Sequence, residues 1–342
     1  MVAKVDPNNE FDESYREALV DQNVAPLWPV LSSLVPHHRP QPVTQANLWK
    51  FRQIRPLLIK AGEVTPIEKA ERRVLVLSDP GRGPAAMQTT ATIYCGLQLL
   101  LPGEKAPSHK HTPNAARIVV EGEGAYTVVD GQKCPMKRGD LILTPSGSWH
   151  DHGHEGKVPV IWLDVLDLPI FVGFEGSYSV PGESVGQPTN FPPPNPDYIH
   201  AGLRPVVLET GTPYPILRFT WERTRQALEG LKAGRKPGTA VELAYVNPLT
   251  GAHCLTTLGF TAMLLPAGET IKPRVRSTSA VFHAVEGEGT SSVNGKEFPW
   301  EAGDTFSMAP FSSVEHRAKS DGFLIRVDDE PLQRSIGYYE ER

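Results

Sequence analysis

Two short stretches of the sequence bring histidines together at spacings that suit a metal site. His109 and His111 are separated by one residue in a segment expected to be extended. Side chains at positions i and i+2 of a strand leave on the same face, so both imidazoles can converge on one ion. A second stretch ends at His150, and His152 and His154 follow it at the same parity. One histidine alone is more often structural than ligating, but the two spacings together reverse that expectation. We therefore expect His109, His111 and His150 to bind a metal.

Imidazole ligands suit several metals. Iron, zinc, copper and nickel all accept this nitrogen donor, and the residue types alone do not select among them. A three-histidine zinc site with one open position would contain the same residues.

The segments around these histidines are typical of short β-strands joined by tight turns. Runs rich in apolar and β-branched residues end at turn signals such as Pro102-Gly103 and Asp130-Gly131; these runs cover residues 73–77, 93–99, 116–120 and 125–129. Strands at this spacing predict an antiparallel sandwich or barrel. Helical periodicity appears at 11–24, where acidic residues occupy the first turn, and a second helix is expected at 221–232.

The strand-and-turn pattern occurs twice. Pro102-Gly103-Glu104 recurs as Ala267-Gly268-Glu269, and Glu121-Gly122-Glu123-Gly124 recurs as Glu286-Gly287-Glu288-Gly289. Further matches pair Asp130-Gly131 with Asn294-Gly295, and Gly139-Asp140 with Gly303-Asp304. Four ordered matches at a nearly constant offset of about 165 residues indicate an internal duplication. A Pro-rich segment that includes 191–196 is expected to connect the two copies.

The second copy lacks the histidines. Arg274 and Arg276 stand where the first copy has His109 and His111, and Val314 falls at the third ligand position, so that His316 corresponds to His152. A guanidinium stays protonated and cannot ligate a metal. We expect the second copy to hold no metal and to serve in packing or assembly. Its two arginines are interpreted as surface residues in preference to an anion site.

Composition excludes several classes of function. The chain has 342 residues, 39% of them hydrophobic and 21% charged, with a formal net charge of −5 and no basic stripe. Nucleic-acid binding and adsorption to an anionic membrane are both disfavoured. Cys95, Cys134 and Cys254 are odd in number and widely spaced, as expected of a reducing compartment. Neither a signal peptide nor a membrane-spanning run is visible, so a cytoplasmic protein is expected.

The histidine spacings resemble the two motifs of the cupin superfamily. In those motifs a glycine and five residues precede His-x-His, and a second glycine and five residues precede Pro-x-Gly-x-x-His. The stretches 103–111 and 139–150 match residue for residue. Most cupins carry a glutamate a few residues after the second histidine, whereas this chain has Ala115 and Ala116 there. A site of three neutral imidazoles would keep the full charge of a divalent ion and leave positions open for an anionic chelating substrate and O2.

Nearly the whole chain resembles the gentisate 1,2-dioxygenase group, which includes salicylate and 1-hydroxy-2-naphthoate dioxygenases. The resemblance rests on Ser14-Tyr15-Arg16 with Pro26-Leu27-Trp28, the segment 49–55, Asn114-Ala115-Ala116-Arg117, and Trp149-His150-Asp151-His152. It implies a mainly β bicupin of two double-stranded β-helix (jelly-roll) barrels with a few peripheral helices. The implied divisions are an N-terminal helical segment (1–60), a metal-binding cupin (61–175), a connector with a helix (176–235) and a degenerate cupin (236–342).

The resemblance also implies the site. His109, His111 and His150 would bind one Fe(II) per subunit in the N-terminal cupin. The catalytic residues would be His152, Arg117 and Asp164, and substrate contacts would come from Arg73, Arg117, Gln98, Tyr94 and Gly96. Strand parity agrees in part, because Tyr94, Gly96 and Gln98 can face one cavity.

The implied activity is O2-dependent opening of gentisate between the carboxyl-bearing and the adjacent hydroxyl-bearing carbon, which gives maleylpyruvate. A homotetramer is also implied. Three alternatives stay open: a salicylate or 1-hydroxy-2-naphthoate dioxygenase, a zinc or nickel isomerase or other cupin dioxygenase on the same scaffold, and a bicupin that binds or stores a ligand without catalysis.

Overall fold

A computed structural model describes residues 11–189, 206–207 and 214–342, and it divides the chain into two compact units, 1–42 and 43–342. The smaller unit contains α1 (Glu13–Asp21) and α2 (Leu31–Leu34). Asp12 caps α1, because its carboxylate accepts the amide of Tyr15 at 2.9 Å. The helix predicted at 11–24 is therefore confirmed, with shorter bounds. The Pro-rich run 191–196 lies outside the described residues.

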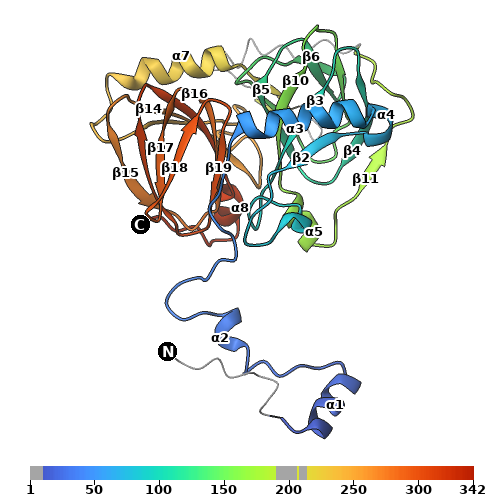
Figure 1. Cartoon of the computed structure of the whole chain (residues 1–342), viewed down its shortest axis with the longest axis vertical. Helices are drawn as coiled ribbons and strands as arrows, with labels where there is room; N and C mark the ends of the chain where they lie inside the picture. Colours follow the sequence, from blue (N-terminus) through green and yellow to red (C-terminus); the bar gives the residue numbers. More distant parts are fainter. Residues whose placement is uncertain (1–10, 190–205, 208–213) are drawn as a thin grey trace. The chain divides into compact units, whose positions relative to one another are not determined.

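The larger unit is built from two copies of one strand series (Figure 1). The first copy contains β2 (Arg73–Val76), β3 (Tyr94–Leu100), β4 (Lys105–His111), β5 (Ala115–Glu121), β6 (Ala125–Val129), β7 (Gln132–Pro135), β8 (Leu141–Thr144), β9 (His150–His154) and β10 (Val160–Leu166). The second contains β13 (Val241–Ala244), β14 (Gly259–Leu265), β15 (Thr270–Val275), β16 (Ala280–Glu286), β17 (Glu288–Val293), β18 (Lys296–Glu301), β19 (Thr305–Met308), β20 (Ser313–Ala318) and β21 (Gly322–Asp328).

The two copies have the same sheet topology. One sheet of the first copy runs β8-β5-β10-β3-β2, and its counterpart runs β19-β16-β21-β14-β13. The opposing sheets run β4-β9-β6-β7 and β15-β20-β17-β18. Each copy is therefore a barrel of two antiparallel sheets packed face to face. One apolar cluster joins residues of both barrels and α3, and a second belongs to the second barrel. The predicted fold class and the internal duplication are both confirmed.

The repeated turns share their backbone conformation. Asp130-Gly131 joins β6 to β7 and Asn294-Gly295 joins β17 to β18, and all four residues have positive φ, between 46° and 84°. Two consecutive residues of positive φ fit a type I′ hairpin turn, which Asp-Gly and Asn-Gly favour because they tolerate the left-handed region. The same turn chemistry closes the same hairpin in both barrels.

Three short strands extend the barrels from other parts of the chain. The strands β11 (Ser179–Pro181) and β12 (Arg218–Phe219) pair with β4 and β8 of the first barrel. The strand β1 (Leu48–Trp49), although it precedes the first barrel in sequence, pairs with β19 of the second. The two barrels are thus tied together by chain that crosses from one to the other.

The remaining helices lie outside the strands. The helix α7 (Trp221–Lys232) has the bounds predicted for it. The helix α3 (Phe51–Val64), which was not singled out from the sequence, packs against β2 and β3. The shorter elements are α4 (Ile67–Ala70), the 3-10 turn η1 (Pro84–Ala86), α5 (Leu168–Gly173) and α8 (Glu330–Ser335). No helix among the described residues is long and apolar enough to cross a bilayer.

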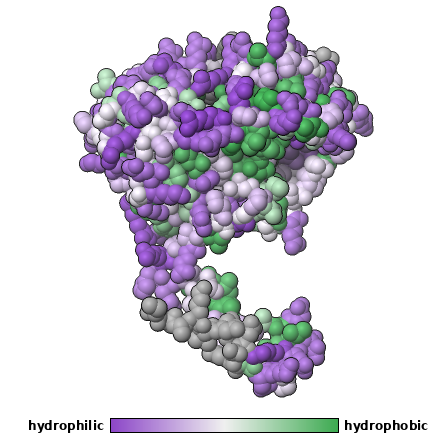
Figure 2. Space-filling model, viewed as in Figure 1, coloured by the Kyte–Doolittle hydropathy of each residue, from purple (hydrophilic) through white to green (hydrophobic). Residues whose placement is uncertain are grey.

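Hydrophilic side chains cover most of the face viewed in Figure 2, and hydrophobic ones gather on the larger unit around α3. Leu57 and Val64 of this helix are both 63% exposed, whereas Leu58 is fully buried in the core. The helix therefore has an apolar face beyond the one that it packs on the barrel.

Candidate metal centre

Three imidazoles converge inside the first barrel. His109 and His111 come from β4, and His150 begins β9, where it pairs directly with His109 across the sheet. The ring centroids are 4.2 Å apart for His109 and His150, 4.8 Å for His111 and His150, and 5.3 Å for His109 and His111. One ring nitrogen from each lies within 4.8 Å of the others, close enough to share one ion. The structure brings the three predicted ligands together.

Backbone carbonyls fix the protonation of two of these rings. The Nδ1 atom of His111 lies 2.8 Å from the carbonyl of Pro113, and that of His150 lies 3.1 Å from the carbonyl of Ser148. A carbonyl only accepts, so Nδ1 carries the proton in both neutral rings and Nε2 keeps a free lone pair. Such carbonyl partners are the usual support of metal-binding histidines.

The third ring has two competing neighbours at Nδ1. Arg72 Nη2 lies 2.6 Å from His109 Nδ1, while the carbonyl of Pro107 lies 3.4 Å from the same atom. A guanidinium only donates, so in this arrangement the proton of a neutral His109 ring is on Nε2. Ligation through Nε2 requires the proton to move to Nδ1, towards Pro107, and this move would release the Arg72 guanidinium from the ring.

The environment keeps all three rings neutral. Burial, with a smaller contribution from nearby arginines, lowers the pKa of His109 to about 3 and that of His111 to about 4. Burial followed by the charge of Arg117 holds the pKa of His150 well below its usual range. Neutral imidazole is the form that binds metals, so the three histidines are in the metal-binding form at neutral pH.

A buried charge pair lies on the opposing sheet of the same barrel. Arg117 of β5 and Asp164 of β10 are direct partners in the strand register, and Arg117 Nε is 3.4 Å from Asp164 Oδ1. Trp162 Nε1 donates to the same oxygen at 2.9 Å. Burial raises the pKa of Asp164 to about 6, against the charge of Arg117, which lowers it. At neutral pH the pair is therefore a cation held by a carboxylate.

Several buried polar atoms in this barrel have no hydrogen-bond partner among the described residues. Among them are Arg117 Nε, Gln98 Nε2 and His152 Nε2, and Arg73 Nε on the other face of the sheet is a further one. The other nitrogen of His152 is held 2.7 Å from Thr127 Oγ1, and its ring packs 5.1 Å from that of Trp162. Buried polar groups are normally paired, so unsatisfied atoms in one barrel indicate room for a polar ligand.

The sheet register places the three β3 residues on the side of the charge pair. Gly96 pairs with Asp164 and Gln98 pairs with Trp162, and Tyr94 shares their parity. A Cβ at Gly96 would lie 2.4 Å from Val74 Cγ1 and 2.9 Å from the Tyr94 hydroxyl. Only glycine therefore fits at this point without displacing its neighbours.

Arg73 does not join the other predicted residues. It pairs with Leu99 in the register, opposite in parity to Gln98, and its guanidinium forms a buried ion pair with Glu104. Its neighbour Arg72 instead contacts His109, one of the three clustered histidines. Arg72 has the same strand parity as Val74, and Val74 pairs with Gln98. The sequence does not give this pairing, so it could not show that Arg72 lies on the side of Gln98.

His154 lies apart from the cluster despite its parity with His150 and His152. Its Nε2 is 2.6 Å from the carbonyl of Val158, and its Nδ1 accepts the amide of Gly156 at 2.9 Å. Both ring nitrogens are used in closing a turn, so the role of His154 is structural.

The second barrel repeats the register with other residues. Arg274 pairs with Val314 as His109 pairs with His150, and His316 Nδ1 lies 2.7 Å from Ser291 Oγ as His152 lies from Thr127. The correspondence predicted from the sequence is therefore confirmed. The predicted surface position holds for Arg274, whose side chain is 54% exposed, but not for Arg276, at 11%.

Known proteins share this architecture and sequence. A family model described as a cupin domain matches residues 96–166. A gentisate 1,2-dioxygenase from Ralstonia sp. is 46% identical over 340 residues, covering 97% of this chain and 95% of that protein. Another from Aquipseudomonas alcaligenes is 37% identical over 96% of this chain and 95% of that protein.

Solved structures agree. Salicylate 1,2-dioxygenase from Pseudoaminobacter salicylatoxidans, in a crystal structure with gentisate, superposes with a TM-score of 0.90 at 32% identity. The match covers 100% of this chain and 96% of that one. With this similarity extending over both barrels, the chain belongs to the gentisate 1,2-dioxygenase family and is an oxidoreductase of the dioxygenase class.

Proposed function

We propose that this dioxygenase opens gentisate with O2, between the carboxyl-bearing and the adjacent hydroxyl-bearing carbon, to give maleylpyruvate with both oxygen atoms incorporated. One observation carries the proposal: three neutral imidazoles, two arginines and a buried neutral histidine line a single barrel interior. This combination suits an anionic aromatic acid beside a metal ion. The names of the relatives support the choice of gentisate.

We assign the metal to His109, His111 and His150, and we propose that it is iron(II). Bound iron(II) would supply open coordination positions for the substrate and O2 and an electron path between them. The residues fit such an ion because two Nε2 lone pairs are already free and no carboxylate belongs to the cluster. An all-imidazole site preserves the ion's double charge, which favours a chelating anion.

Arg72 is proposed to bind the substrate carboxylate, in place of Arg73. Burial lowers the pKa of Arg72 to about 10, so the side chain remains a cation at neutral pH. Its Nη2 already donates to the carbonyl of Pro107 at 2.7 Å and reaches His109 at 2.6 Å. If the guanidinium of Arg72 exchanged its contact with the neutral His109 ring for a carboxylate, it would gain two charge-assisted hydrogen bonds.

Arg117 and His152 are proposed to stabilise negative charge that develops on the opening ring. Arg117 is fully buried: its Nε faces Asp164 at 3.4 Å, and its Nη1 donates to Thr144 Oγ1. In the neutral His152 ring, Nε2 is unpartnered. Fixed donors in a site that excludes water stabilise an oxyanion without reorganising during the reaction.

The ring pocket is proposed to lie against Tyr94, Gly96 and Gln98. Glycine at position 96 lets Val74 and the Tyr94 hydroxyl approach the strand closely, and Gln98 contributes an unpartnered amide nitrogen. These polar groups suit a ring with more than one hydroxyl, which favours gentisate over salicylate. A 5-aminosalicylate 1,2-dioxygenase from Comamonas sp., 33% identical over 96% of the chain, shows that relatives differ in ring substituent.

Oxygen uptake by the iron-loaded protein tests the proposal. Gentisate, salicylate and 1-hydroxy-2-naphthoate would each be offered to the protein loaded anaerobically with iron(II), with O2 followed by electrode and products by mass spectrometry. We expect one O2 consumed per gentisate and the highest kcat/KM for that acid. Preference for another of the three acids would reassign the substrate, and no ring opening with any of them would refute the proposal.

We further propose a homotetramer, and domain divisions at residues 60, 175 and 235. The exposed apolar face of α3 supports assembly, because contiguous apolar surface commonly marks a contact between chains. Light scattering on the full chain would give the oligomeric mass.

A further inference from the structure

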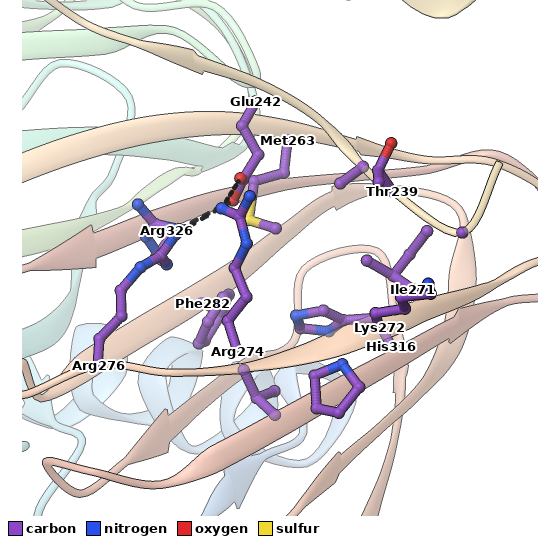
Figure 3. Close-up of a pocket in the computed structure, with 14 residues that line it drawn as sticks. Thr239, Glu242, Met263, Ile271, Lys272, Arg274, Arg276, Phe282, His316 and Arg326 are labelled. Atoms are coloured by element: carbon purple, nitrogen blue, oxygen red, sulfur yellow. Dashed lines mark hydrogen bonds and ion pairs between the residues drawn. The ribbon is translucent and has the colours of Figure 1, made fainter. Parts of the chain in front are cut away.

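The second barrel contains a cavity of about 260 Å³ at the place that the histidines occupy in the first. Arg274, Arg276 and Val314 line it, and they stand in the register of His109, His111 and His150. The other lining residues include Lys272, Arg326, Glu242, Phe282, Met263, Ile271 and His316 (Figure 3). The second barrel therefore has a cavity lined by cationic and apolar side chains where the first barrel has its three histidines.

Cations outnumber carboxylates at this cavity. Lys272, Arg274, Arg276 and Arg326 line it, and Glu242 is the carboxylate among the lining residues. Figure 3 shows the three arginine side chains converging on the side of Glu242, whose oxygens lie 2.8 Å from Arg274 and 2.9 Å from Arg326. Asp328 and Glu341 lie behind them and compensate part of the excess.

Arg276 retains hydrogen-bonding capacity that the protein does not use. Its Nε faces Glu341 Oε1 at 3.5 Å, the limit of a hydrogen bond, and its Nη2 lies 4.0 Å from Glu242 Oε1, so neither carboxylate holds the guanidinium closely. Arg326, by contrast, donates to Asp328 at 2.8 Å and to Glu242 at 2.9 Å. A mostly buried guanidinium with unused donors costs free energy unless a ligand supplies acceptors.

The remaining cavity wall is apolar. Phe282 stands where the first barrel has Arg117, since it pairs with Arg326 as Arg117 pairs with Asp164. Its ring stacks on Phe306 at 4.8 Å and lies edge-on to His316 at 5.3 Å. Met263, Ile271 and Val314 also line the cavity.

The His316 ring is neutral, because burial lowers its pKa to about 3. Trp300 Nε1 donates to Ser291 Oγ at 2.9 Å, so the hydroxyl proton of Ser291 is free to bond to His316 Nδ1. In that arrangement Nε2 of His316 carries the ring proton and becomes a further donor for an anion.

We propose that this cavity binds a small organic acid, with its carboxylate on Arg276 and Arg274 and its apolar body against Phe282 and Met263. Paired guanidinium nitrogens match a carboxylate bidentately, and the aromatic and aliphatic wall selects against a purely inorganic anion. The volume of about 260 Å³ lies just below the range of small-molecule pockets, roughly 300–1,000 Å³, so the acid is limited to about the size of a single ring. The site does not depend on the metal or the reaction of the first barrel.

Benzoate binding to the iron-loaded full chain tests this site, because benzoate has a carboxylate and an apolar ring but no hydroxyl. Isothermal titration calorimetry would compare wild type with Arg276→Gln and with Val314→Phe, which fills the cavity and leaves every charge in place. Arg317→Gln is the matched control: it removes the same charge from an exposed residue that does not line the cavity. Inorganic phosphate would be titrated in parallel.

We expect wild type and Arg317→Gln to bind one more equivalent of benzoate than either cavity variant, or to bind that equivalent at least ~10-fold more tightly. Gentisate turnover should be equal in all four proteins. Equal benzoate stoichiometry and affinity in all four would overturn the site. Phosphate that bound as tightly as benzoate and competed with it would overturn the assignment to an organic acid. Because turnover is measured separately, failure of this site and failure of the proposed reaction remain distinguishable.

Discussion

The adjacent residues Arg72 and Arg73 offer a matched pair of substitutions with opposite expected effects. Arg72 contacts His109 of the three clustered histidines, whereas Arg73 on the other face forms a buried ion pair with Glu104. Changing each to glutamine removes one positive charge and preserves a long polar side chain. We expect Arg72→Gln to impair catalysis and Arg73→Gln to impair stability.

The contacts of the two arginines determine the expected loss of kcat/KM in Arg72→Gln and of stability in Arg73→Gln. Loss of the charge-assisted bonds from Arg72 to a carboxylate removes about 1.5–3 kcal/mol, which lowers kcat/KM for gentisate by ~10–150-fold. Arg73 is 2% and Glu104 18% exposed, and the glutamate also accepts the amide of Leu101 at 2.7 Å. Leaving this carboxylate without its cation costs about 3 kcal/mol, near the low end for a buried pair, which lowers the Tm of a chain of this length by about 5 °C.

Steady-state kinetics and thermal unfolding of the two variants, with wild type as reference, measure both effects. The Arg72→Gln protein should unfold within a few degrees of wild type and retain its iron. The Arg73→Gln protein should keep its KM at temperatures where it is folded. If Arg73→Gln raised KM while Arg72→Gln left kcat/KM unchanged, the assignment of the carboxylate contact to Arg72 would be refuted.

Three further predictions concern other parts of the molecule. Asp164→Asn should lower kcat/KM ~10-fold or more, because Arg117 loses its partner; wild-type activity should fall as pH drops through about 6, and persistence of that limb in the variant would exclude Asp164 as its source. Tyr94→Phe should reduce the preference for gentisate over salicylate by about 3–10-fold in kcat/KM, and an unchanged ratio would place the second ring hydroxyl elsewhere. Burial raises the pKa of Asp329 to about 6, so the folded protein favours the neutral acid. Ionisation of Asp329 therefore destabilises the folded protein increasingly as pH rises from about 4 to 6. Asp329→Asn, which can still accept the hydroxyl of Thr92, should therefore have a free energy of unfolding up to about 3 kcal/mol above that of wild type above pH 6, seen as a higher Tm, and lose that gain near pH 4. A Tm difference that did not vary with pH would contradict this.

The sequence predicted which three histidines come together because the information for that is local. The i and i+2 spacing of His109 and His111 determines their common face whatever the rest of the fold does. The duplication was visible for a similar reason, since turns that require positive φ, such as Asp130-Gly131 and Asn294-Gly295, keep their residue types.

Features that depend on non-local pairing could not be predicted in this way. Whether Arg72 or Arg73 faces the cavity depends on the register of β2 with β3, and a slip of one residue reverses every face. The pairing of β1 with β19 joins segments more than two hundred residues apart, and no pattern within either segment indicates it. The burial of Arg276 likewise results from packing around the second barrel, so the sequence favoured the surface interpretation.

The central claim is that three imidazoles hold the iron needed for ring opening. Metal analysis and O2 uptake with gentisate would be compared for wild type, His150→Ala and His154→Ala. The last variant removes a histidine of the same strand whose ring nitrogens bond to Val158 and Gly156. We expect about one iron per chain and full O2 uptake in wild type, iron retained in His154→Ala, and both iron and O2 uptake lost in His150→Ala with the fold preserved. Full iron content and turnover in His150→Ala would contradict the account.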